Sequence, residues 1–135
     1  NRKAMAWVSV AGVIVNLGIA IFFFFLMALF AKFKLPLFLP KAFFSIAFVN
    51  ILLMVFNMLP FPPLDGYNFL TSILPENAAR WLIKNNRIFM GIFFVLLIVG
   101  WLHYLYMPII NFFLWAFSNI FGVQDLVIAI ISGAI

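Results

Sequence analysis

The chain has 135 residues, of which 68% are hydrophobic and only 8% are charged, so a water-soluble domain is excluded and an integral membrane protein is predicted. The net charge is +5, but lysines and arginines in a membrane protein set its orientation, so we expect no nucleic-acid partner. There is no cysteine, which excludes disulfides and thiolate-bound metals.

The first apolar run, from Ala4 to Ala31, carries no charged residue and is long enough to span a membrane. Within it Gly12, Asn16 and Ala20 recur every four residues and therefore share one helical face. Small and polar residues in such a stripe allow another helix to approach closely. The block from Phe22 to Phe25 is expected to face lipid.

A basic turn then reverses the chain, and it contains three lysines and two prolines: Lys32, Lys34, Pro36, Pro40 and Lys41. Residues Ala42 to Leu59 follow as a short second span. Its strongly polar members, Asn50 and Asn57, are seven residues apart and lie on the same face. For Asn50 the sequence favours a hydrogen bond to another helix. Asn57 could do the same or contact a ligand.

The second span ends in Asn57-Met58-Leu59-Pro60-Phe61-Pro62-Pro63-Leu64-Asp65-Gly66. Three prolines so close together cannot continue a helix, because each lacks an N–H and clashes with the preceding turn. The chain must therefore unwind near the membrane boundary. A carboxylate delivered there is costly, which makes Asp65 a candidate functional residue. The alternative is a plain turn in which Gly66 supplies a positive φ.

The segment after Pro75 is predicted to form an amphipathic helix at the membrane surface, with Arg80, Lys84 and Arg87 on one face. A third span is predicted from Ile88 to Met107, with Pro108 interrupting the helix. The one histidine, His103, lies among interfacial aromatic residues and is interpreted as hydrogen-bonded rather than as a metal ligand.

Two short apolar stretches, 109–121 and 123–135, complete the chain as either one broken span or a hairpin. The predicted fold is thus an all-α polytopic transmembrane bundle of three to four spans, in one domain over residues 1–135, with a proline-broken segment at the candidate site. Basic residues on the two sides of the membrane favour a cytoplasmic location for the loop from Pro62 to Arg87. Oligomeric state is not indicated.

The decapeptide resembles the N-x-x-P-x-P-P-L-D-G signature of the site-2 protease family of intramembrane zinc metalloproteases. Residues 11–16, Ala-Gly-Val-Ile-Val-Asn, resemble a second family signature, A-G-P-x-x-N, with Val13 in place of the proline. The resemblance implies that Asp65 is one of three protein ligands of zinc and that Gly66 and Asn16 have structural roles near the site. It also implies that Asn57, Pro60, Pro62 and Pro63 line the path of a transmembrane protein substrate in a bacterial membrane.

The family's H-E-x-x-H motif, which supplies two zinc ligands and the general base, is absent from these residues. No catalytic residue is therefore assigned. Either the chain is the C-terminal portion of a site-2 protease whose H-E-x-x-H helix lies upstream, or it is a non-catalytic relative. Two other classes remain open, namely an ion-coupled transporter with a second broken helix and a structural membrane subunit.

Overall fold

The computed structural model describes residues 2–34 and 36–135, and the described chain is entirely helical apart from turns and loops. Its seven helices are α1 (Arg2–Lys32), α2 (Phe38–Asn57), α3 (Asp65–Ile73), α4 (Glu76–Lys84), α5 (Asn86–Val99), α6 (His103–Phe121) and α7 (Gln124–Ser132). The predicted all-α fold is confirmed. Among the described residues α1, α2 and α6 are long and apolar enough to cross a membrane, and the bent pair α4–α5 could add a fourth span.

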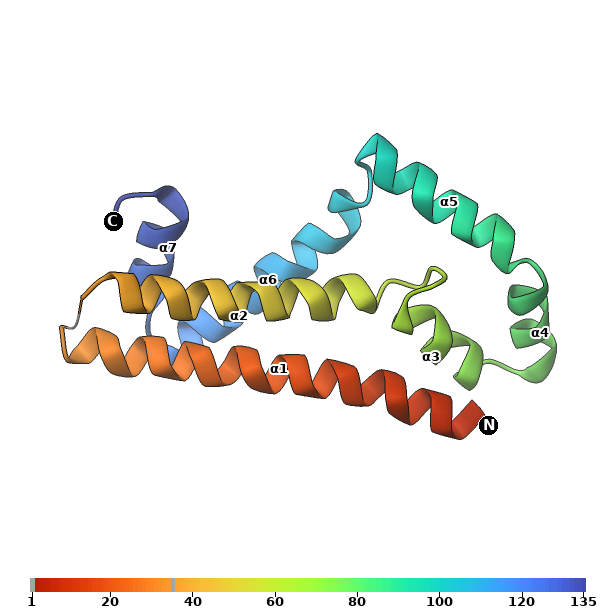
Figure 1. Ribbon diagram of the computed structural model, residues 1–135, viewed down its shortest axis with the longest axis horizontal. Helices are drawn as coiled ribbons and strands as arrows, with labels where there is room; N and C mark the ends of the chain where they lie inside the picture. Colours follow the sequence, from red (N-terminus) through yellow and green to blue (C-terminus); the bar gives the residue numbers. More distant parts are fainter. Residues whose placement is uncertain (1, 35) are drawn as a thin grey trace.

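Helices α1 and α2 form an antiparallel hairpin, and α6 crosses behind it (Figure 1). The turn between α1 and α2 is the predicted one, although Pro40 lies in the first turn of α2, where a missing N–H costs little. Ala20 and Ala47 are fully buried, and such small side chains let the two helices approach closely. The hydrophobic core therefore lies mainly between α1, α2 and α6.

Phe24 is fully buried in this core, where its ring lies 5.5 Å from that of Phe117 and 6.2 Å from that of Phe44. The expectation that the whole block of phenylalanines faces lipid is thus wrong for Phe24, whereas Phe22 and Phe25 are exposed. A continuous block cannot all point one way, because a helix turns by 100° at each residue.

The predicted third span from Ile88 to Met107 is wrong. Helix α5 ends at Gly100, which has φ +84°, and the Trp101 N–H donates to the Leu96 carbonyl at 3.0 Å. This is the usual way for a helix to end at a left-handed glycine. The predicted interruption of the helix at Pro108 is also wrong, since this proline lies inside α6.

The predicted amphipathic helix is α4, but it ends at Lys84, so Arg87 lies beyond it in α5. The chain bends by 63° between α4 and α5. In Figure 1 α4 and α5 form an arch that leads from α3 to α6. The buried residue of α5 is Phe93, which packs against Leu59 and Leu102. Gly122 separates α6 from α7 as expected, again with a positive φ. The arch therefore meets the rest of the chain at the proline segment.

Candidate functional site

The proline segment between α2 and α3 is an irregular but compact turn. After Asn57, the Phe61 N–H donates to the Leu59 carbonyl at 2.9 Å and the Leu64 N–H donates to the Phe61 carbonyl at 2.8 Å. Pro62 is buried, whereas Pro60 and Pro63 are exposed. The prediction that the helix breaks here is confirmed, and the turn brings α3 back across the end of α2.

Glycine is required at position 66 because of a close contact and not because of its backbone conformation. It lies in the first turn of α3 without a positive φ, so the alternative explanation for the Asp-Gly pair is wrong. A Cβ atom at Gly66 would lie 2.2 Å from the Met58 carbonyl oxygen and 2.4 Å from that of Leu59. Only glycine allows α3 to begin directly on these two carbonyls, and this contact determines where Asp65 lies.

Asp65 is the first residue of α3 and is half-buried. A negative charge is favoured there, because the N–H groups at a helix start carry a partial positive charge. Its carboxylate faces α1: a Cβ atom built on Gly12 would lie 3.7 Å from Asp65 Oδ2. The structure thus brings together the Asp-Gly pair and the Ala-Gly pair of α1, which are more than fifty residues apart in the sequence.

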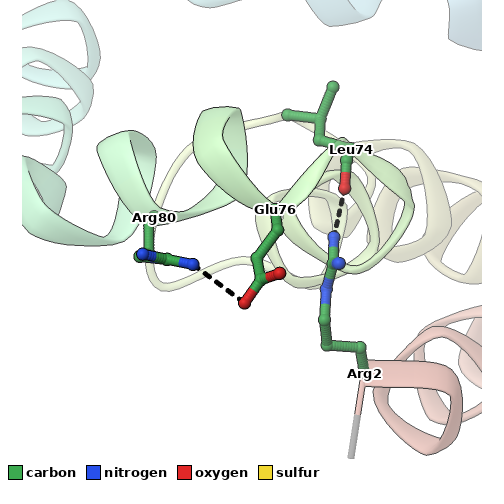
Figure 2. A network of polar contacts seen from close by, with 4 residues as sticks. All are labelled: Arg2, Leu74, Glu76 and Arg80. Carbon is green, nitrogen blue, oxygen red and sulfur yellow. Dashed lines mark hydrogen bonds and ion pairs between the residues drawn. The ribbon is translucent and has the colours of Figure 1, made fainter.

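The far end of α3 is held by Arg2. Its guanidinium donates to the Thr71 carbonyl at 2.9 Å. It also donates to the Leu74 carbonyl, and Figure 2 shows this second contact. These carbonyls lie at the C-terminus of α3, which favours a cation. Since Gly12 meets the start of α3 and Arg2 meets its end, α3 runs antiparallel along the first turns of α1.

Helix α3 is also joined to α4. The buried Tyr67 hydroxyl donates to the Leu82 carbonyl at 3.0 Å, and burial raises the pKa of this phenol above its ordinary value of 10.0. Within α4, Arg80 forms an exposed ion pair with Glu76 at 2.9 Å, also shown in Figure 2. An exposed pair of this kind adds little stability. Burial and the Tyr67 hydrogen bond are what hold α4 in place.

An apolar cavity of about 430 Å³ lies between α1, α2, α6 and the proline segment. Its wall includes Val13, the neighbour of Gly12, and Pro60 from the proline segment. Three residues of α6 close the other side: Leu105, Ile109 and Phe113. Val13 follows Gly12 in the sequence, so consecutive residues of α1 contribute to the cavity and to the contact with Asp65.

Most of the other predicted site residues do not line this cavity. Asn57 and Asn16 are half-buried, and neither they nor Pro62 and Pro63 line the cavity. The apolar cavity residues of α6 were not predicted, because apolar residues fill the whole sequence and give no specific signal. Asn50 is also not used as expected, since its amide donates to the Ile46 carbonyl of its own helix at 2.8 Å.

The described residues do not complete a zinc site, since among them no group of three His, Cys, Asp or Glu side chains lies close enough to hold a metal. Catalytic zinc has three protein ligands and an open position. Asp65 offers one carboxylate of the right type. His103 is exposed at the start of α6, where its ring contacts the Gly100 carbonyl.

Comparison with known proteins gives two matches. The model of peptidase family M50 matches residues 35–100, which include the proline segment, α3 and α4. A Bacillus subtilis (strain 168) protein named "Putative zinc metalloprotease YwhC" is 32% identical over 116 residues, which are 82% of this chain and 53% of that protein. The chain thus spans about half the length of this relative. No solved structure matches it. By its proline and Asp-Gly signature and by these matches, the chain belongs to peptidase family M50, the site-2 protease family.

Proposed function

We propose that these 135 residues are the C-terminal portion of an intramembrane zinc metalloprotease of bacterial cell membranes. The observation that best supports this proposal is the position of Asp65 at the start of a short helix that is held at both ends. Its carboxylate faces Gly12 of α1. A plain loop aspartate would need no such support. The membership in a metallopeptidase family and the similarity to a protein named as a zinc metalloprotease support this reading.

In this proposal Asp65 supplies one zinc ligand. The other two ligands and the general base belong to an H-E-x-x-H helix outside the 135 residues. When bound, zinc lowers the pKa of a water molecule to about 7 and polarises the substrate carbonyl. The role of this chain is to hold the Asp65 carboxylate rigidly, through Gly66 at the start of α3 and Arg2 at its end.

The substrate is proposed to be a transmembrane protein that approaches from the lipid bilayer. The apolar cavity beside Val13 and Pro60 has the size and lining to accept a large apolar side chain of such a substrate. Asn57, Pro62 and Pro63 are proposed to line the path to it, and Asn16 to support the site from α1. The basic residues of α4, together with Arg2 and Lys3, favour a cytoplasmic position for the site.

The rival transporter hypothesis needs a second broken helix, for which Pro108 was a candidate position, but α6 continues through this proline. A purely structural subunit would give no reason for a glycine pressed onto two carbonyls beside the carboxylate. The metalloprotease is therefore the function that the site supports best.

The test uses the full-length protein with Asp65→Asn, and with the exposed Asp125→Asn as the matched control. We expect Asp65→Asn to weaken zinc affinity at least about 100-fold, since even residues that only orient ligands contribute 10- to 100-fold. Cleavage of a membrane substrate should fall with it, while the control keeps both. Unchanged zinc content and cleavage in Asp65→Asn, or a complete coding sequence without H-E-x-x-H, would overturn the proposal.

A further inference from the structure

Basic residues gather at one end of the molecule. Five are exposed there and together are called the basic patch: Arg2, Lys3, Arg80, Lys84 and Arg87. The first two begin α1, and the others lie on α4 and in the first turn of α5. Arg2 and Arg80 line the same surface pocket of about 200 Å³, so the start of α1 lies beside α4. Figure 2 shows these two arginines on either side of Glu76.

The basic patch has a large excess of positive charge. Its carboxylate is Glu76, which forms an ion pair with Arg80. The two other acidic residues of the chain lie at the start of α3 and in α7. Lys84 and Arg87 are exposed and form no ion pair within residues 2–34 and 36–135. Five cations against one carboxylate give the patch a net charge of +4.

The apolar surface next to the basic patch places it at the depth of the lipid head groups. Ile92 and Leu97 point to different sides of α5, and they are 42% and 44% exposed. One neighbouring helix would cover one of these sides, so lipid tails contact the other. Trp81 of α4, which is 59% exposed, is of a residue type that is enriched at membrane interfaces. The patch, at the N-terminal end of α5, therefore faces head groups.

We infer that the basic patch binds the head groups of anionic phospholipids and selects them over zwitterionic ones. Lysine and arginine side chains near an anionic membrane surface are attracted to it, and each adds to the binding. An arginine can also donate two parallel hydrogen bonds to phosphate oxygens. A zwitterionic head group carries a positive charge of its own, which the excess positive charge of the patch repels. Cations that only fixed the orientation of the chain would give no such preference.

The experiment measures which lipid lies next to α4 in the full-length protein. A fluorophore is attached at Asn77→Cys, an exposed position in the first turn of α4, in an otherwise cysteine-free chain. The phosphatidylcholine vesicles contain a small fraction of phosphatidylglycerol or phosphatidylcholine that carries a quencher on its acyl chain. We expect stronger quenching by phosphatidylglycerol, and Lys84→Gln should lower this preference about fivefold, the effect of one near-surface charge. This readout requires neither zinc nor proteolysis.

Two matched variants separate the local charge from other effects. Lys84→Arg keeps the charge and should keep the preference. Lys32→Gln removes a lysine at the opposite end of α1 and should leave quenching at position 77 unchanged. Sodium chloride at about 1 M should reduce the preference, because it shortens the Debye length to about 3 Å.

Equal quenching by the two lipids in the wild type, or an unchanged preference in Lys84→Gln, would overturn the inference. Absence of quenching by either lipid would show that another part of the protein covers the basic patch, and it would overturn the inference as well.

Discussion

Replacing Gly66 by alanine should displace the candidate site. The added Cβ would lie 2.2 Å from the Met58 carbonyl oxygen, and a real contact needs at least 3.0 Å, so α3 would have to move by about 0.8 Å. The atoms in the way belong to the backbone and cannot rotate aside. We therefore expect a cost near the upper end for overpacking, about 3 kcal/mol. For a chain of this size that corresponds to a fall in melting temperature of about 10 °C.

The assay is thermal unfolding of the full-length protein in detergent, followed by its zinc stoichiometry. The matched control is Gly91→Ala, because a Cβ there meets nothing within 4 Å. In a helix interior this change should stabilise by about 0.5–1 kcal/mol. If Gly66→Ala melted at the wild-type temperature and bound zinc equally well, the close approach of α3 to the proline segment would be refuted.

The remaining predictions concern the two contacts of α3 with α1. Gly12→Ala should be tolerated, since its Cβ would lie at an ordinary 3.7 Å from Asp65 Oδ2, whereas Gly12→Leu should push the carboxylate away and reduce zinc occupancy at unchanged expression. Equal occupancy in both variants would contradict the placement of Asp65. Arg2→Gln should remove the charged clamp on the end of α3, at a cost of about 1 kcal/mol, and so speed amide hydrogen exchange of residues 71–74. Exchange as slow as in the wild type would show that the clamp does not hold α3.

Much of the fold follows directly from the sequence. The charge-free run before Lys32 and the lysine-rich turn predict the α1–α2 hairpin, because apolar length and basic loops reflect the dimensions of the bilayer. The prolines after Asn57 predict the break, since proline cannot continue a helix. The error over the third span has a local cause. Gly100 ends α5 through a left-handed conformation, which a hydropathy pattern does not reveal.

The candidate site could be predicted from the sequence only in part. The sequence by itself determined that the chain is a helical membrane protein, where its proline break lies, and that Asp65 is the residue to examine there. Only the tertiary structure decided that Asp65 faces Gly12, that Gly66 is required by two carbonyls, and that Arg2 holds the other end of α3. The physical reason is that helix length and breaks depend on neighbouring residues, whereas a close approach between helices depends on side chains that are far apart in the chain.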